Sequence, residues 1–350
     1  MYKMIDLFSG AGGMALGFLD ERYGGGFECV FSIDNDAAAF DTYRTNFEGN
    51  HLLVDIEVYL KCSDRVPEAD IVIGGPPCQG FSLLNKERCG DPRRALWEPY
   101  LEIVIKSCAG VFVMENVSEL LRSPEMIKIV ERAEENGYVL NAGILNAADY
   151  GVPQVRKRTV IIGALKKLFP TGINLPAPTH VGRWRTVKEA LADLPEPKGT
   201  EIRDVPGPLN LHFGRSPTEL SRKRYRAVPP GGNRFDLQRN APDLVPECWR
   251  KKVSGGTDLF GRLWWDRPAV TIRTEFFKPE KGRYLHPEKD RPITHREAAR
   301  LMGFPDDFIF KGSKIQIARQ IGNAVPPALA GAIALQVKKS LDALRSRRTS

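Results

Sequence analysis

The sequence predicts an α/β protein, with a doubly wound and mainly parallel sheet and a second, smaller, loop-rich domain. Short apolar runs rich in Val and Ile alternate with longer helix-forming stretches over the first 165 residues. After residue 165 these periodic runs give way to a texture rich in Pro, Gly and Arg. The chain has 350 residues, which is enough for two domains, and its hydrophobic fraction of 42% supplies a core.

The expected strands are short and rich in apolar and β-branched side chains, as in buried parallel sheets. They span residues 4–8, 27–33, 51–56, 70–73, 111–114, 138–145 and 159–164. Helices are expected between them at 35–47, 92–109 and about 124–136. Pro92 lies in the first turn of one helix and Gly137 follows the end of another, as helix boundaries prefer.

A glycine-rich turn follows the first expected strand. Gly10, Gly12 and Ala15 fit the G-x-G-x-x-G/A spacing between a strand and a helix, although Gly17 adds a spacing that is not specific to dinucleotides. Asp34 ends the next strand, where a carboxylate can accept hydrogen bonds from ribose hydroxyls. We therefore expect a nucleoside-containing cofactor here, and the presence of a pyrophosphate stays open.

The fourth expected strand runs into a rigid turn that carries a cysteine. After Ile73 come Gly74-Gly75-Pro76-Pro77, which combine backbone freedom with a stiff exit, and then Cys78. Reactive groups of open α/β sheets lie just past the carboxyl ends of strands, so Cys78 has the placement of a nucleophile. The alternative is a small, buried packing cysteine.

Charged side chains follow the next strands. Glu115 comes directly after the strand 111–114. On an extended chain, Gln154, Arg156 and Arg158 share one face, and two arginines there indicate recognition of an anion or a carbonyl. An edge strand protected by charge is the competing interpretation.

The net charge of +8 is unevenly distributed. Residues 151–310 carry 30 Lys and Arg against 18 Asp and Glu, a net of +12, whereas the remainder has a net of −4. A basic segment of this kind indicates a polyanionic partner, with an ordinary solvated surface as the alternative. Basic clusters at 222–226 and 250–252 lie near several aromatic residues in the sequence, which is typical of a surface that reads nucleic acid. These aromatic residues are Tyr225, Phe235, Trp249, Trp264 and Trp265.

The sequence indicates a cytoplasmic setting and no membrane segment. No run of 18 apolar residues is present, and the N-terminus enters a strand pattern without the layout of a signal peptide. The six cysteines show no C-x-x-C spacing, so we expect neither a metal site nor a disulfide framework. Two helices, 294–302 and about 328–344, close the chain, and the second is long enough to pack against the first domain.

Six motifs, in this order, resemble those of the C5-cytosine DNA methyltransferase family. They are Asp6-Leu7-Phe8-Ser9-Gly10-Ala11-Gly12-Gly13, Gly75-Pro76-Pro77-Cys78-Gln79-Gly80-Phe81-Ser82, Glu115-Asn116-Val117, Gln154-Val155-Arg156-Lys157-Arg158, Arg291-Pro292-Ile293-Thr294-His295-Arg296-Glu297 and Gln320-Ile321-Gly322-Asn323-Ala324-Val325-Pro326-Pro327. The resemblance covers nearly the whole chain except about 166–260. It implies a Rossmann-like fold and methyl transfer from S-adenosylmethionine to C5 of a cytosine flipped out of a specific duplex DNA sequence.

The resemblance also implies a division of labour along the chain. It places a catalytic and cofactor-binding domain at 1–165, a target-recognition domain at 166–310, and a segment returning to the catalytic domain at 311–350. The chain then resembles a monomeric bacterial or phage enzyme. Such enzymes most often belong to restriction-modification systems, with a possible cognate restriction endonuclease that acts on the same site.

The implied catalytic residues make chemical sense for a reaction at an unreactive carbon. The thiolate of Cys78 would add to C6, Glu115 would hydrogen-bond or protonate N3, and Arg158 would stabilise charge at O2, with Arg156 orienting its neighbours. Asp34 would bind the ribose and Asp55 the adenine amino group. The implied cofactor-binding set is Phe8, Gly10, Gly12, Asp34, Asn35, Asp55, Ile56, Pro77, Leu96, Asn323, Ala324 and Val325. Asn35 stands where the family usually has an aromatic residue.

Three alternatives remain open from the residues alone. A dinucleotide-dependent dehydrogenase shares the fold pattern, but it leaves Cys78, Glu115 and the basic segment unexplained together. A tRNA cytosine-5 methyltransferase usually carries a Cys-Phe-Thr motif, which this sequence lacks. A non-catalytic DNA-binding regulator would not need the intact set of Cys78, Glu115 and the two arginines.

Overall fold

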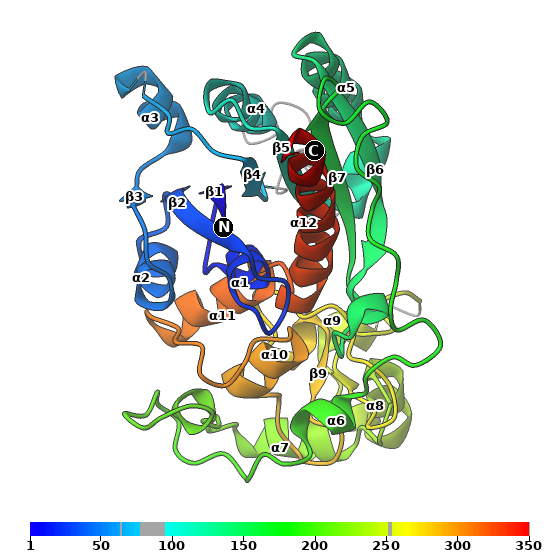
Figure 1. Ribbon diagram of the computed structural model, residues 1–350. Coiled ribbons are helices and arrows are strands. Elements are labelled where there is room, and N and C mark those ends of the chain that lie inside the picture. The colour runs from blue at the N-terminus through cyan, green and yellow to red at the C-terminus, as the bar shows by residue number, and fades with distance from the viewer. Residues whose placement is uncertain (64, 78–94, 251–253, 350) are drawn as a thin grey trace. The chain divides into compact units, whose positions relative to one another are not determined.

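The computed structural model describes residues 1–63, 65–77, 95–250 and 254–349 (Figure 1). It divides into two compact units by contacts within the chain. Unit 1 comprises Met1–Tyr150, Arg156–His180 and Ala324–Ser350, and unit 2 comprises Gly151–Val155 and Val181–Asn323. The chain therefore passes between the units four times.

Unit 1 is built on a seven-stranded sheet in the order β3-β2-β1-β4-β5-β7-β6. Pairing is parallel from β3 across to β5, and β7 is antiparallel to both of its neighbours. The strands are β1 (Tyr2–Leu7), β2 (Phe27–Asp34), β3 (His51–Leu53), β4 (Ile71–Gly74), β5 (Val111–Val117), β6 (Tyr138–Asn146) and β7 (Lys157–Leu165). All seven expected strands are present, so the predicted doubly wound, mainly parallel fold class is confirmed.

The helices of unit 1 connect these strands in sequence. They are α1 (Gly13–Leu19), α2 (Ala37–Asn46), α3 (Ile56–Cys62), α4 (Trp97–Lys106), α5 (Pro124–Glu135) and α12 (Pro327–Thr349), with 3-10 turns η2 (Ser118–Arg122) and η3 (Ala147–Tyr150). The expected start of α4 at Pro92 lies outside the described residues, and the described helix begins at Trp97. α12 approaches α1 closely, because a Cβ on Gly17 would lie 2.6 Å from the nitrogen of Gly331.

Two predicted strand ends were wrong by three residues each. The strand expected to end at 114 continues to Val117, because β7 pairs with β5 beyond the last residue of β4, with Glu115 opposite Val160. The strand expected over 51–56 ends at Leu53, and Asp55 instead caps α3 by accepting a hydrogen bond from the backbone N–H of Glu57. A carboxylate that accepts from a free helix N–H stabilises the start of the helix.

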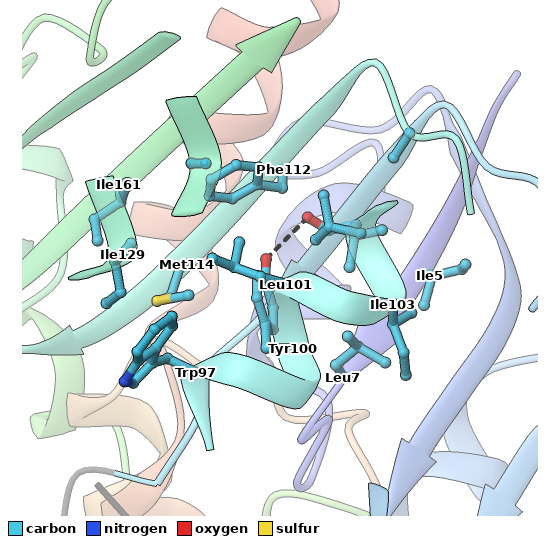
Figure 2. Close-up of a cluster of buried hydrophobic side chains, with 14 of the residues drawn as sticks. Ile5, Leu7, Trp97, Tyr100, Leu101, Ile103, Phe112, Met114, Ile129 and Ile161 are labelled. Carbon is cyan, nitrogen blue, oxygen red and sulfur yellow. Dashed lines mark hydrogen bonds between the residues drawn. The ribbon is translucent and has the colours of Figure 1, made fainter. Parts of the chain in front are cut away.

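The core of unit 1 is an apolar cluster between the sheet and its helices (Figure 2). Leu7, Phe112 and Met114 from the strands pack with Leu101 and Tyr100 from α4. The buried Tyr100 hydroxyl donates to the carbonyl of Val113 at 2.8 Å, so the one polar atom of this ring is satisfied. Burial of such side chains is worth roughly 1.5–3 kcal/mol each, so this cluster contributes strongly to the stability of unit 1.

Unit 2 has short elements joined by long irregular stretches. Its helices are α6 (Val187–Leu191), α7 (Glu219–Arg226), α8 (Arg234–Asn240), α9 (Glu247–Arg250), α10 (His295–Leu301) and α11 (Lys314–Asn323). Strands β8 (Gly261–Arg262) and β9 (Arg283–Leu285) pair in parallel, and the 3-10 turns are η4 (Leu209–Leu211), η5 (Pro242–Leu244) and η6 (Pro279–Lys281). Its loop-rich character is as expected from the Pro- and Gly-rich sequence.

Buried arginines bind the backbone of unit 2 together. The Arg262 guanidinium, which is 3% exposed, donates to the carbonyls of Val228, Tyr225, His286 and Lys289 at 2.6–2.9 Å. Arg283 likewise donates to several loop carbonyls, including that of Arg262 at 2.8 Å. Buried carbonyls of irregular backbone need donors, and these side chains supply them where a sheet would otherwise do so.

Across the described ranges, no helix is both long enough and apolar enough to cross a membrane.

Candidate active site

The glycine turn after β1 lies beside the carboxylate that ends β2. The backbone N–H of Gly10 donates to Oδ2 of Asp34 at 2.7 Å, and that of Asp36 donates to Oδ1 at 2.8 Å. Burial raises the pKa of Asp34, although these two N–H groups oppose the shift. Gly12 has a φ of 87°, and a Cβ there would lie 2.2 Å from the Phe47 ring, so this position requires glycine.

A second carboxylate lies at the next strand end along the same edge. Asn35 Nδ2 donates to Oδ2 of Asp55 at 3.3 Å, while Oδ1 of Asp55 caps α3. Asn35 is exposed and the following Ile56 is buried. Asn35, which replaces the usual aromatic residue, thus places its amide against Asp55. Both carboxylates of the predicted cofactor site, Asp34 and Asp55, are therefore held at defined positions.

Glu115 lies in β5 next to the turn that follows β4. A Cβ built on Gly75 would lie 3.4 Å from Oε2 of Glu115. The neighbouring Asn116 donates from Nδ2 to the carbonyl of Pro76 at 3.0 Å, which ties the Gly75–Pro77 segment to β5. The structure therefore fixes the backbone that leads into Cys78 beside the Glu115 carboxylate, and Cys78 itself lies outside the described residues.

The Glu115 carboxylate is buried and faces a cation. Arg158 Nε is 2.9 Å from Oε1, an ion pair rather than an aligned hydrogen bond, since Oε1 accepts no hydrogen bond from a described residue. Burial raises the pKa of Glu115, and the charges of Arg158 and then Arg156 oppose the shift. The result is a carboxyl group that holds a proton more readily than usual, next to a fixed positive charge.

Of the three residues predicted to share a face, Arg156 and Arg158 belong to unit 1 and Gln154 to unit 2, so their common face stays a prediction. Arg156 is buried in unit 1, and its field acts on Glu115 together with Arg158. Gln154 belongs to unit 2, where Nε2 donates to the carbonyl of Leu301 at 3.1 Å and Oε1 accepts from the N–H of Ile272 at 2.8 Å. The alternative of a charged edge strand is wrong, because β7 lies between β5 and β6.

The remaining predicted cofactor residues fall at several places. Phe8 is partly buried in the turn after β1 with a φ of 53°, and Pro77 and Leu96 flank the undescribed range. Asn323 is the last residue of α11 in unit 2, and Ala324 and Val325 open the last segment of unit 1. The structure thus brings Asp34 to the Gly10 turn and Asn35 to Asp55.

Of the five aromatic residues near the basic clusters, Tyr225 is buried and the other four are partly exposed, so their place on a surface that reads nucleic acid stays a prediction. Tyr225 and Trp249 pack around Phe260 in a core cluster of unit 2, with ring centroids 5.6 Å apart in both pairs. Trp264 lies under the Arg283 guanidinium at 4.1 Å. These rings stabilise the unit, because irregular loops leave apolar space that large side chains fill.

One residue was missed from the sequence. Asn116 Nδ2 ties the turn before Cys78 to β5, and this role depends on strand pairing that the sequence does not show.

The comparison with known families agrees with this geometry. The model of the family described as C-5 cytosine-specific DNA methylase matches residues 2–339. The chain belongs to this family. As a C5-cytosine DNA methylase, it is an enzyme that methylates C5 of cytosine in DNA, and the alternatives of a tRNA enzyme, a dehydrogenase or a non-catalytic regulator are disfavoured.

Relatives of this DNA methylase are similar over most of their length. The chain is 37% identical over 347 residues to the Type II methyltransferase M1.HphI of Haemophilus parahaemolyticus, covering 96% of this chain and 86% of the relative. It is 34% identical to M.MthTI of Methanothermobacter thermautotrophicus, with 96% of both chains covered. Among solved structures, a putative DNA modification methyltransferase encoded within an E. coli prophage aligns over 98% of this chain and 100% of its own, with a TM-score of 0.71 and 26% identity.

Proposed function

We propose that this DNA methylase uses S-adenosylmethionine to methylate a cytosine that is flipped out of a specific duplex sequence, with Cys78 as nucleophile. The observation that carries the proposal is the buried Glu115 carboxylate, which sits between Arg158 and the turn leading into Cys78. A nucleophile alone cannot activate cytosine. An acid and a cation next to the nucleophile can do so, because they stabilise the charge that develops on the ring.

The chemistry assigned to Glu115 follows from its raised pKa. In its protonated form the carboxyl can donate to N3 of the base, and it thereby draws electron density from C6. Arg158 would then stabilise the charge that develops at O2, and the buried Arg156 would support it through the electrostatic field.

Cys78 is proposed to complete the reaction from its place beyond Pro77. Its thiolate forms a bond to C6, and the electron pair of the C5–C6 double bond gives C5 the nucleophilic character needed for methyl transfer. After transfer, C5 loses its proton to a base or water, the S–C6 bond breaks, and the aromatic ring is restored. The target carbon is inaccessible in a stacked duplex, so base flipping precedes these steps.

The residues at the strand ends fit S-adenosylmethionine, which supplies the electrophilic methyl group when bound. A Cβ on Gly10 would meet no neighbour closer than 4.0 Å, which leaves open space at the turn. The Asp34 carboxylate suits ribose hydroxyls, and that of Asp55, held by Asn35, suits the adenine amino group. The full proposed set keeps Phe8, Gly12, Ile56, Pro77, Leu96, Asn323, Ala324 and Val325.

We propose that residues 166–310 recognise the DNA target, with the catalytic domain at 1–165 and a returning segment at 311–350. Support comes from the basic charge of this region and from exposed cations such as Arg222 and Lys223 on α7. The names of the relatives support a role as the modification enzyme of a restriction-modification system, alongside a restriction endonuclease that acts separately. We propose a cytoplasmic monomer, because one chain holds both sets of residues and bacterial DNA lies in that compartment.

The decisive experiment traps the covalent intermediate on DNA containing 5-fluorocytosine. Fluorine cannot leave as the C5 proton does, so the protein should remain attached through denaturation, with the adduct on the peptide that contains Cys78. Cys78→Ser should abolish methylation and trapping while S-adenosylmethionine binding, measured by calorimetry, persists. Cys62→Ser, at an exposed cysteine on α3, is the matched control and should behave as wild type.

Two outcomes would contradict the assignment. An adduct on another cysteine, or near-normal methylation by Cys78→Ser, would refute the nucleophile. Unchanged cofactor affinity in Asp34→Ala would separately refute the proposed ribose contact.

A further inference from the structure

A buried carboxyl group in β1 takes no direct part in the proposed chemistry. Asp6 is 1% exposed and lies in the strand that precedes the Gly10 turn. The Tyr43 hydroxyl of α2 hydrogen-bonds its carboxyl group, and Oδ2 of that group has no hydrogen-bond partner among the described residues. A buried carboxyl group depends strongly on the partner it has, because losing that partner leaves its desolvation cost uncompensated.

The Tyr43 hydroxyl also contacts a second side chain of the sheet. Its oxygen is 3.4 Å from Sγ of Cys29, which lies in β2. Burial raises the pKa of the Cys29 thiol to about 12, so this group stays a neutral thiol and adds no second buried charge beside Asp6. Since β1 and β2 are paired in parallel, the hydroxyl is held between side chains of two adjacent strands.

The ring of Tyr43 lies against the predicted cofactor turn. A Cβ built on Gly12 would lie 3.1 Å from Cδ2 of Tyr43, and closer still to the Phe47 ring. The rings of Tyr43 and Phe47 contact each other with centroids 4.8 Å apart, and the His51 ring lies 4.9 Å from that of Tyr43. A displacement of Tyr43 would therefore change the surface on which Gly12 rests.

The helix that carries Tyr43 also holds the carboxylate proposed to bind the ribose. Oδ1 of Asp34 accepts from the N–H of Asp36, the N-cap residue of α2, while Oδ2 accepts from the N–H of Gly10. Tyr43 lies about two turns further along α2. The helix is thus attached to the glycine turn at its start through Asp34 and near its end through Tyr43.

We propose that Asp6 and Tyr43 are positioning residues for the cofactor. Their hydrogen bond fixes the Tyr43 ring against Gly12, and this contact sets the spacing between the glycine turn and Asp34. The inference rests on the proposed function, in which that turn and Asp34 bind S-adenosylmethionine. Asp6 and Tyr43 are each 1% exposed, so they act through the turn and not by touching the methyl group. A site held in its binding geometry beforehand loses less free energy on binding.

The test removes the hydrogen bond and keeps the ring. In Tyr43→Phe, calorimetry should show S-adenosylmethionine binding weakened about fivefold, the scale of one hydrogen bond. Binding of S-adenosylhomocysteine, the product left after methyl transfer, should weaken by the same factor, because both molecules share the nucleoside that the turn holds. KM for S-adenosylmethionine should rise in parallel, whereas kcat at saturating cofactor should stay within about twofold of wild type.

Variants of Asp6 test whether the two side chains act as one unit. Asp6→Asn keeps an oxygen that accepts from the Tyr43 hydroxyl, so its affinity for S-adenosylmethionine should stay near that of wild type. Asp6→Leu removes the acceptor and should weaken binding as much as Tyr43→Phe does. The double variant Asp6→Leu/Tyr43→Phe should bind no more weakly than either single variant, because each removes the same hydrogen bond.

A matched control separates positioning from a general loss of stability. Tyr138 in β6 is also buried, and its hydroxyl donates to the carbonyl of Ala109 at 2.6 Å. In the sheet, β6 is separated from β1 by β4, β5 and β7. Tyr138→Phe should lower the melting temperature about as much as Tyr43→Phe does, but it should leave cofactor affinity unchanged. This pair decides the question even if Asp6→Leu does not fold.

The outcomes separate this inference from the proposed function. Wild-type cofactor affinity in Tyr43→Phe, or an equal loss of affinity in Tyr138→Phe, would overturn the positioning role while methylation by the wild type stands. A loss in Asp6→Asn as large as that in Tyr43→Phe would overturn the dependence on the hydrogen bond. Failure of the wild type to bind S-adenosylmethionine would instead refute the proposed function.

Discussion

The two units reach stability by different means. Unit 1 satisfies its backbone through sheet pairing and buries an apolar cluster between strands and helices. Among its described residues, unit 2 has one two-stranded sheet, and its loops depend on buried arginines such as Arg262 and Arg283, which donate to their carbonyls. An irregular backbone that presents varied loops is thus compatible with a fixed shape when side chains replace the missing sheet hydrogen bonds.

The largest expected effect tests whether the chemistry depends on unit 1 alone. Glu115→Gln keeps the shape but removes the proton donor, so kcat should fall by about 10²–10⁴. DNA affinity should change much less than kcat, because the phosphate contacts proposed for the basic region are left intact. In the wild type, the activity that requires protonated Glu115 should decline as pH rises through its raised pKa.

Single-turnover methylation measures this effect, with Glu102→Gln on the exposed side of α4 as control. Near-normal turnover in Glu115→Gln would exclude a catalytic role for this carboxyl. The two units would then differ in how they are stabilised, but this experiment would not show that they differ in function.

The next effect concerns stability, and it should be confined to unit 2. Arg262→Met preserves bulk but leaves four carbonyls without their donor, and we expect a loss of about 3 kcal/mol. Amide hydrogen exchange of peptides should show faster opening in unit 2 and unchanged protection in β4 and β5. Arg222→Met, at an exposed arginine of α7, should change stability by less than about 0.5 kcal/mol. Equal effects of the two variants would refute the arginine-based core.

Acid should weaken unit 2 through its buried histidines. Burial lowers the pKa of His286 and of His295 to about 4 each. For His286, the effect of burial outweighs that of the nearby Glu297 carboxylate, which would raise the pKa. A folded-state pKa below the unfolded value of about 6.5 means that stability is lost as pH falls from 6.5 toward 4. We expect a loss of about 2 kcal/mol per histidine between pH 7 and pH 5.

Hydrogen exchange at the two pH values measures this loss, and His286→Gln should reduce it by about half. A unit 2 whose protection is constant from pH 7 to pH 5 would show that these imidazoles are not held neutral.

The smallest expected effect concerns unit 1, whose stability should fall as pH rises, whereas that of unit 2 should fall as pH decreases. Asp6 in β1 is buried and hydrogen-bonded to Tyr43, and burial raises its pKa well above the usual value. Its contribution to stability is present at low pH and is lost as pH rises through the raised pKa. Asp6→Asn should therefore flatten the decline of unit 1 protection toward alkaline pH. A steeper decline in that variant would contradict a protonated Asp6.

Unit 1 was predictable because its signals are local. Runs such as Ile71–Gly74 and Val111–Met114 combine β-branched residues with flanking turn residues, and strand positions follow from that pattern. The extension of β5 to Val117 was not predictable, since it requires pairing with β7, whose first residue lies 40 positions later. The placement of Glu115 inside a strand therefore could not be read from the sequence.

Unit 2 was less predictable because the sequence does not show which of its charged side chains are buried. Arg262 and Arg283 read as surface cations, and only the fold reveals that loop carbonyls surround them. The same applies to Trp184 and Trp249, which the sequence does not distinguish although one is exposed and the other packs on Phe260. Of the candidate site, the sequence identified the carboxylates and arginines of unit 1, but it did not show the hydrogen bonds that Gln154 makes within unit 2.

The four passages of the chain between the units have a consequence for hybrid enzymes. Exchanging 181–323 between relatives would transfer most of unit 2 as one piece, yet Gln154 would stay behind with the acceptor. Its amide group must then match the Ile272 N–H and the Leu301 carbonyl of the incoming segment. A graft designed by sequence continuity alone would cut through this contact, so donors should be chosen with glutamine at that position or transplanted together with residues 151–155.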